Sequence, residues 1–222
     1  MLPRRATVAY AKVWVATMLW LLAGIVGLRH AVRGMANLPA GPVIVAAKHQ
    51  SAWDTLALFA LIGDPAVVVK RELTWIPLFG WCLLRAGMLP VDRAGGGAAL
   101  RRLVAAAKRR AADGRSILVF PQGTRTPPCA ALPYQLGVAA LYGALGLPVV
   151  PVALASGLFW PRRSTRLEPG TIEVEVLPAI APGLDRRAFM ARLEGAIEPA
   201  TARLEGDVLA RRAAASPAAS GP

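Results

Sequence analysis

The chain places a histidine and an aspartate, His49 and Asp54, within the segment KHQSAWD at residues 48–54. An imidazole can accept a proton near neutral pH, and a carboxylate beside it can fix its tautomer and stabilise the cation that forms. The sequence contains only one other histidine, His30. We therefore take His49 as the candidate general base and Asp54 as the group that orients it.

The spacing of the pair requires His49 to lie in a loop. Residues five apart on a regular helix lie about 140° apart around the axis and do not meet. Ser51 predicts the N-cap of a helix, and Asp54 lies three residues later, where its side chain can point back toward His49. The same pattern also fits a capping box with no catalytic role.

The elements around this pair predict an α/β fold. An apolar run at residues 42–47 predicts a buried strand, and the apolar residues after Ser51 predict a helix to about Ile62. Reactive side chains of α/β folds are often exposed at such strand-to-helix junctions. Further apolar runs at residues 66–70, 87–91 and 116–120 also end on polar side chains.

The polar residues after these runs are candidates for binding an anion. Lys70 and Arg93 end two of the runs, and the third leads into Gln122, Gly123, Thr124 and Arg125. Gly123 lets a ligand approach the backbone, Thr124 offers a hydroxyl, and Arg125 offers a fork for phosphate. The alternatives are an ordinary Asp92–Arg93 surface ion pair and a plain turn at residues 121–126.

Length and composition indicate one domain with an apolar surface and an anionic partner. At 222 residues the chain fits a single α/β domain with an appendage. The hydrophobic fraction of 55% and mean hydropathy of +0.45 indicate contact with lipid. The net charge of +13 suits phosphate, anionic lipid or nucleic acid, although a GC-rich genome also explains abundant arginine. Neither cysteine belongs to a metal-ligand pattern, so we expect no metal site.

The first part of the chain predicts a membrane-associated helix. Residues 6–28 are apolar enough and long enough to cross ~30 Å of hydrocarbon. Arginines flank both ends, so a helix that spans the bilayer and one that lies in a single leaflet are both consistent with the sequence. Residues 73–85 predict either a buried short helix or a second lipid-facing surface. Residues 98–112 predict a helix with a basic face for solvent or lipid headgroups.

The remaining pattern completes the expected organisation. We expect a helix at residues 133–145, a strand at 147–155 with Pro151 at a sheet edge or bulge, and a half-exposed strand at 171–177 near the sheet's edge. A polar helix follows at 185–212. The chain then divides into a membrane-associated segment (1–34), a main domain (35–212) and a disordered tail (213–222).

The order and spacing of these clusters resemble the bacterial type of the 1-acylglycerol-3-phosphate O-acyltransferase family, also called lysophosphatidic acid acyltransferases. Residues 49–54 match the family's His-x4-Asp block, and residues 87–93, 120–125 and 150–152 match its second, third and fourth blocks. The segments KREL at 70–73 and IPLFGW at 76–81, which lie between the first two blocks, also match the family. The resemblance covers about residues 38–177. The departure is Gln122, where the family normally has glutamate.

The resemblance implies a mixed, mostly parallel sheet flanked by helices, similar to glycerol-3-phosphate acyltransferase, with the N-terminal helix at the membrane. It implies transfer of a fatty acyl group from acyl-ACP or acyl-CoA to the sn-2 hydroxyl of lysophosphatidic acid, which forms phosphatidic acid in phospholipid synthesis. It also implies a place at the inner membrane with the site facing the cytoplasm, and no cofactor beyond the acyl donor. His49 and Asp54 would be catalytic. The implied substrate-binding residues are Lys70, Arg93, Gln122, Gly123, Thr124, Arg125 and Pro151.

Two alternatives remain open at this stage. The change at Gln122 also suits an acyltransferase for a different lyso-lipid, such as lyso-ornithine lipid. The basic composition also suits a non-catalytic lipid-binding protein. The long apolar segment at the start of the chain disfavours nucleic acid as the partner.

Overall fold

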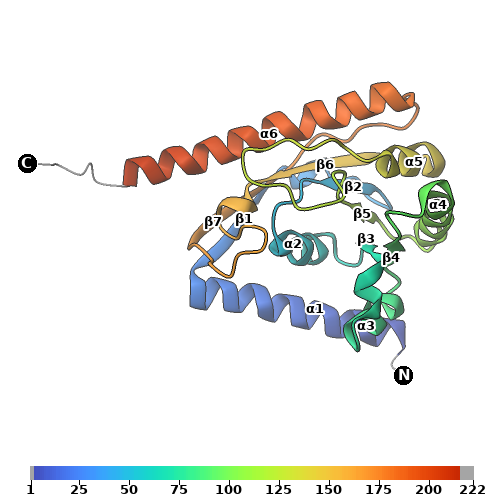
Figure 1. Cartoon of the computed structure of the whole chain (residues 1–222), viewed down its shortest axis with the longest axis horizontal. Coiled ribbons are helices and arrows are strands. Elements are labelled where there is room, and N and C mark those ends of the chain that lie inside the picture. Colours follow the sequence, from blue (N-terminus) through green and yellow to red (C-terminus); the bar gives the residue numbers. More distant parts are fainter. Residues whose placement is uncertain (1–2, 216–222) are drawn as a thin grey trace, which may run out of the picture.

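The computed structural model describes residues 3–215, which form one mixed sheet between two layers of helices (Figure 1). The strand order is β1-β7-β6-β2-β5-β3-β4, with β6 and β7 antiparallel and the other neighbours parallel. The strands are β1 (Leu28–Arg33), β2 (Ile44–Ala47), β3 (Ala66–Lys70), β4 (Leu89–Val91), β5 (Ile117–Val119), β6 (Val149–Leu154) and β7 (Gly170–Val176). The helices are α1 (Arg4–Leu21), α2 (Ala52–Ile62), α3 (Phe79–Arg85), α4 (Gly96–Ala112), α5 (Leu136–Leu145) and α6 (Arg186–Ala215). The predicted mostly parallel α/β sheet is confirmed.

Strand β2 shows how the sheet separates two hydrophobic cores. Val45 and Ala47 belong to the core beneath α1 and α2, whereas Ile44 and Ala46 belong to the core beneath α4, α5 and the first half of α6. Successive side chains of a strand point to opposite faces, so a central strand covered on both sides must be apolar throughout. This explains the uninterrupted apolar run before Lys48.

Strand β6 differs from the sequence prediction in its position. Pro151 was expected at an edge or bulge, but β6 lies inside the sheet between β2 and β7. The prediction was wrong because proline is excluded only where a strand needs its missing N–H. Here Pro151 bonds through its carbonyl oxygen, which accepts from Leu177 N at 2.9 Å.

The edge strand β1 comes from the segment assigned to the membrane. After α1 the chain makes a π-helical turn at Leu22–Val26 and passes Gly27, whose φ of 73° reverses its direction. Residues 28–33 then pair in parallel with β7, and Arg33 forms an ion pair with Glu173. The sheet therefore begins before residue 34. At the other end, α6 continues to Ala215, and residues 216–222 of the predicted tail lie outside the described residues.

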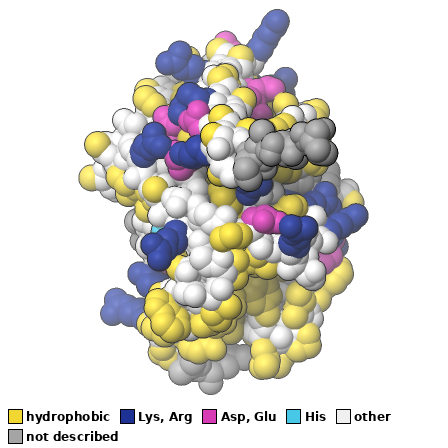
Figure 2. Space-filling model, turned by 90° about the vertical axis from the view of Figure 1, so that its left-hand side faces the viewer, with side chains coloured by type: hydrophobic (Ala, Val, Ile, Leu, Met, Phe, Trp, Pro, Cys, Tyr) yellow, Lys and Arg dark blue, Asp and Glu magenta, His cyan; other side chains and the backbone are white. Residues whose placement is uncertain are grey.

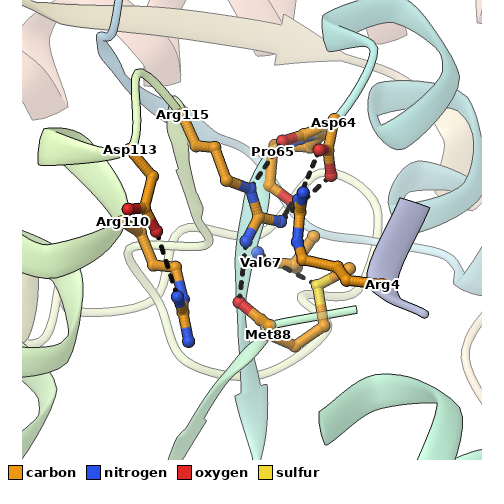
Figure 3. Close-up of polar contacts among 9 residues, drawn as sticks. Arg4, Asp64, Pro65, Val67, Met88, Arg110, Asp113 and Arg115 are labelled. Carbon is orange, nitrogen blue, oxygen red and sulfur yellow. Dashed lines mark hydrogen bonds and ion pairs between the residues drawn. The ribbon is translucent and has the colours of Figure 1, made fainter. Parts of the chain in front are cut away.

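Helix α1 is fastened to the domain at its start by a polar network. Arg4 forms an ion pair with Asp64, which also pairs with Arg115 at 3.1 Å (Figure 3). The buried Arg115 guanidinium donates further hydrogen bonds to Pro65 O and Gly87 O, both 3.1 Å long. The network joins α1 to the turn between α2 and β3 and to Gly87, two residues after the end of α3.

A continuous part of the surface is apolar. α1 is the one helix among the described residues, together with its π-helical turn, that is long and apolar enough to cross a membrane. Its inner face packs on α2 through Val8 and Val15, and its outer face is exposed. Figure 2 shows hydrophobic side chains gathered on the lower part of the molecule, the side on which Figure 1 places α1. The exposed large side chains here are Tyr10, Val13, Trp14, Trp20, Ile25, Leu73, Trp75, Ile76, Leu78, Phe79, Trp81 and Leu84.

We call these twelve side chains the apolar platform. Those from residues 73–84 include Trp75 and Trp81, which are 65% and 62% exposed. The alternative of a buried short helix in this segment is therefore wrong. Soluble surfaces rarely expose so large an apolar patch, so the platform favours contact with lipid.

Candidate active site

The first turn of α2 contains the predicted capping box. Ser51 is the N-cap, and its hydroxyl oxygen accepts from Trp53 N at 3.2 Å. The Asp54 carboxylate accepts from Ser51 N at 2.8 Å and from Gln50 N at 2.7 Å through Oδ2. These bonds satisfy backbone donors that a helix start leaves unpaired.

The same oxygen of Asp54 also contacts the candidate base. Asp54 Oδ2 lies 2.9 Å from His49 Nδ1, so the capping box and the His–Asp pair exist together. Because Oδ2 already accepts from two backbone N–H groups, it acts as an acceptor toward His49 as well. Nδ1 then carries the ring hydrogen, which leaves Nε2 as the basic nitrogen. Asp54 is fully buried and His49 is 16% exposed, so a substrate can reach the imidazole but not the carboxylate.

The imidazole is held by a second neighbour from the third block. The rings of His49 and Phe120 stack with their centroids 3.9 Å apart and their planes 19° apart. The loop that follows Phe120 returns to the same place, since Thr126 N donates to His49 O at 2.7 Å. The loops after β2 and β5 therefore form one unit, as the shared strand direction predicts.

The residues on either side of His49 point the opposite way. Lys48 and Gln50 continue the alternation of β2 and face α6, while His49 faces α2. Lys48 Nζ lies 2.6 Å from Glu198 Oε2, and Gln50 Nε2 donates to Glu205 Oε1 at 2.6 Å. Neither contact was predicted from the sequence. The alternation of β2 extended past its end would have shown that both side chains face away from Asp54.

In the third block, Gln122 is buried and turned toward α6. Its Nε2 donates to Glu198 Oε1 at 3.1 Å, and Tyr134 donates its hydroxyl to the same oxygen at 2.8 Å. Burial, and after it the negative charge of Glu198, raise the pKa of Tyr134 far above its usual range, so the hydroxyl stays a donor. Gln122 Oε1 has no hydrogen-bond partner among the described residues.

The other third-block residues lie in the loop beside His49. Gly123 has φ of 68°, a conformation that favours glycine, and its N–H donates to Phe120 O at 2.9 Å. Thr124 and Arg125 follow and are partly exposed. This loop has the geometry of a tight turn at the edge of the site.

The predicted cations lie at the carboxyl ends of the parallel strands. β2, β5, β3 and β4 are parallel neighbours, so Arg125, Lys70 and Arg93 all follow carboxyl ends on one side. Asp92 pairs with Arg71 at 2.9 Å, so the suggested Asp92–Arg93 pair was wrong. Lys70 pairs with Glu72 at 3.4 Å. Within residues 3–215, Arg93 and Arg125 form no ion pair, which leaves both guanidinium groups available to an anion.

Pro151, the remaining candidate, lies away from these loops. It is buried in β6 opposite Ala46 in the parallel pairing with β2. Ala46 precedes His49 by three residues, about 10 Å along an extended chain. A binding role for Pro151 stays a prediction.

An apolar cavity of about 350 Å³ lies between α1, α2 and α3. Thr55, the residue after Asp54, contributes to its wall, so the cavity begins at the first turn of α2. Other walls are formed by Ala11, Trp14, Phe59, Leu78 and Leu83. A site with a buried His–Asp pair, unpaired arginines and an adjacent apolar cavity can bind an amphipathic anion and remove a proton from it.

Comparisons with known proteins agree with this chemistry. Residues 29–155 match the family described as Acyltransferase. Over 190 residues the chain is 36% identical to the 1-acyl-sn-glycerol-3-phosphate acyltransferase of Pseudomonas aeruginosa, covering 85% of this chain and 74% of that protein. It is 31% identical over 178 residues to the protein of the same name from Salmonella typhimurium, covering 78% and 72%. The fold is similar to the crystal structure of the 1-acyl-sn-glycerophosphate acyltransferase from Thermotoga maritima, with a TM-score of 0.73, 22% identity and coverage of 92% and 81%.

Proposed function

Because the chain belongs to the acyltransferase family, we propose that it transfers a fatty acyl group to the sn-2 hydroxyl of 1-acyl-sn-glycerol-3-phosphate and so forms phosphatidic acid. The observation that carries the proposal is the 2.9 Å contact between His49 Nδ1 and Asp54 Oδ2, just beyond the carboxyl end of β2. The names of the Pseudomonas and Salmonella relatives support the choice of acceptor. Acyl-ACP and acyl-CoA are both suitable donors, since each presents the acyl group as a thioester.

The mechanism needs a base because an alcohol attacks a thioester slowly unless its proton leaves as the bond forms. His49 Nε2 takes the proton of the acceptor hydroxyl while the oxygen attacks the thioester carbonyl. Asp54 stabilises the imidazolium that results. The tetrahedral intermediate then collapses to the ester, and His49 returns the proton to the leaving thiolate. Transfer is direct, since Ser51 is buried and occupied as the helix cap.

Arg93 and Arg125 bind the phosphate of the acceptor in this proposal. Both follow strands whose carboxyl ends lie on the side of His49, and guanidinium groups bind phosphate through paired hydrogen bonds. Backbone N–H groups near Gly123 add donors. The phosphate then holds the glycerol hydroxyl within reach of His49.

The apolar platform would place the enzyme on the membrane that holds its lyso-lipid. α1 packs along α2 through Val8 and Val15, which supports a helix lying in one leaflet rather than crossing the bilayer. An acyl chain can then pass from the bilayer into the cavity between α1, α2 and α3. We place the enzyme at the inner membrane of the cell, with its active site facing the cytoplasm.

The test is an acyl-transfer assay of the purified protein in detergent micelles, with acyl-CoA and acyl-ACP as donors. The acceptors are lysophosphatidic acid, lysophosphatidylcholine and lyso-ornithine lipid. We expect product mainly from lysophosphatidic acid, and a loss of ~10²- to 10⁴-fold in the His49→Ala variant. Equal turnover by His49→Ala, or product from lyso-ornithine lipid alone, would overturn the proposal.

A further inference from the structure

Helix α6 carries two carboxylates that face the active-site loops. Glu198 and Glu205 lie two helical turns apart and therefore on the same side of α6. α6 comes after the stretch 29–155 that matches the acyltransferase family, and the other buried side chains of α6 are mostly apolar. The contacts of these two residues give α6 a role beyond covering the sheet.

Glu198 binds both loops of the site. Its Oε2 pairs with Lys48 Nζ at 2.6 Å, and its Oε1 accepts from Gln122 at 3.1 Å and from Tyr134 at 2.8 Å. Lys48 is fully buried, and its other hydrogen bond is to Ala130 O at 3.1 Å. A buried ammonium group needs a counter-ion, because desolvation costs several kcal/mol per charge. Glu198 is that counter-ion.

Glu205, two turns after Glu198 on α6, also binds the His49 loop and a second segment of the chain. Its Oε1 accepts from Gln50 Nε2 at 2.6 Å and from Cys129 N at 3.0 Å. The carbonyl oxygen of the Gln50 side chain accepts in turn from Gly157 N at 3.1 Å. Glu205 thus joins the His49 loop to the chain after the third block.

Together the two carboxylates hold the residues immediately before and after His49. Lys48 and Gln50 point to α6, and His49 projects between them toward Asp54 on the other face. Because the side chains of Lys48 and Gln50 are both held by α6, the backbone of His49 between them is held as well. A shift of about 1 Å in a catalytic group can cost ~10²-fold in rate.

We propose that Glu198 and Glu205 are positioning residues that hold His49 in register with Asp54 and with the third-block loop, and that Glu198 and Gln122 act as a matched pair. This inference rests on the proposed function. Gln122 presents an N–H to Glu198, which a glutamate at that position could do only when protonated. An ionised glutamate there would place two carboxylates about 3 Å apart, which is unfavourable. The amide at residue 122 is therefore required by Glu198 and does not determine which lipid headgroup the enzyme accepts.

A double-mutant cycle tests the matched pair. The variants are Gln122→Glu, Glu198→Gln and the double exchange, which keeps one carboxylate and one amide in contact. We expect each single change to lower kcat at least about tenfold, with the KM of both substrates within about twofold of wild type. The double variant should recover to within about threefold of wild type, a coupling of at least ~2 kcal/mol. Each effect should be the same with every lyso-lipid that the enzyme accepts.

Matched controls separate positioning from folding. Asp207→Asn changes an exposed carboxylate on the same helix and should leave kcat and the midpoint of thermal unfolding unchanged. Gln122→Met keeps the length of the side chain without a charge, so it should lose less activity than Gln122→Glu. If Glu198→Gln does not fold but the double variant does, the coupling is shown directly.

Two results would overturn the inference while leaving the proposed function in place. One is a double variant whose loss equals the product of the single losses. The other is equal loss for Gln122→Met and Gln122→Glu when the double variant cannot be purified. By contrast, a wild-type protein that transfers no acyl group to any lyso-lipid contradicts the proposed function itself.

Discussion

Asp54 Oδ2 accepts hydrogen bonds from the N–H groups of the two residues before α2 and lies 2.9 Å from His49 Nδ1, so a single oxygen both caps the helix and orients the base. The helix start contributes partial positive charge that stabilises a carboxylate there. His49 is then fixed by Asp54 on one side and by the stacked ring of Phe120 on another. The catalytic pair is formed by the fold before any substrate binds.

The two roles of Asp54 can be separated by mutation. Asp54→Asn should abolish most acyl transfer, because an amide oxygen supports the imidazolium poorly and the amide can present the wrong group to Nδ1. Ser51→Ala removes only the other half of the capping box and should cost about 1 kcal/mol of unfolding free energy. Its kcat should stay within about threefold of wild type. Steady-state kinetics and thermal melts check both, and equal losses of kcat in the two variants would mean that capping alone matters.

The stack between His49 and Phe120 should contribute to the orientation of the base. Phe120→Leu keeps an apolar side chain but loses the flat face, and aromatic pairs contribute about 0.5–1.5 kcal/mol beyond their area. We expect kcat to fall roughly 3- to 10-fold with little change in thermal stability. Phe120→Tyr retains the ring and serves as the control. A Leu variant with unchanged kcat would show that Asp54 is sufficient to hold His49.

Arg93 and Arg125 should act on the acceptor. Loss of a charge-assisted hydrogen bond to phosphate costs about 1.5–3 kcal/mol, or roughly 10- to 150-fold in binding. Arg93→Ala and Arg125→Ala should each raise the acceptor KM by about this factor. Replacement by lysine should restore binding only in part, because lysine lacks the planar guanidinium fork. Arg102→Ala on the exposed face of α4 is the control. A change confined to the donor KM would assign these arginines to the acyl donor instead.

Much of the fold could be predicted from local sequence patterns. The runs that became β2 and β5 are buried on both faces, so they appear as short, uninterrupted apolar segments, and the run that became β3 is buried at its start. The N-cap at Ser51 marked the start of α2, and Gly63 marked its end. β1 could not be predicted in this way. Its residues, LRHAVR, are mostly exposed because the strand lies at the sheet's edge, and they follow directly on an apolar helix that dominates the composition.

The site was predictable where its contacts are local. His49 and Asp54 are five residues apart, so the loop and the cap determine their contact. The contacts of Lys48 and Gln50 with α6 join residues 150 and 155 positions apart, and no local pattern specifies them. The sequence marked Gln122 as unusual, but only the position of Glu198 explains the amide.

Arg115 should be important for stability rather than for activity. Its guanidinium is buried and bonded to Asp64, Pro65 and Gly87, and burial, opposed by the charge of Asp64, lowers its pKa. Arg115→Met would leave the Asp64 carboxylate and three backbone carbonyl groups without this donor, at a cost of about 3 kcal/mol. Urea unfolding measures the loss. A change below about 0.5 kcal/mol would show that the network of Figure 3 contributes little to folding.

The apolar platform should bind lipid through side chains that the folded protein does not need for its own core. Trp20, Trp75 and Trp81 are each more than 60% exposed, at 71%, 65% and 62%. A charge at these positions meets water in the free protein but must enter the interface of the bilayer in the bound one, which is unfavourable. Trp20→Glu with Trp75→Glu should therefore lower the affinity for liposomes of lysophosphatidic acid and phosphatidylglycerol at least tenfold.

The control for the platform lies on the opposite side of the sheet. Leu209 on α6 is 44% exposed, and Figure 1 shows α6 and α1 on opposite sides of the molecule. Leu209→Glu adds the same charge and should leave liposome binding unchanged. Liposome flotation in low and high salt measures both variants, because the tryptophan contribution is hydrophobic and should persist when charges are screened. Activity on short-chain acceptors in detergent should survive in both. Loss of flotation in Leu209→Glu alone would place the lipid-binding surface on α6 instead.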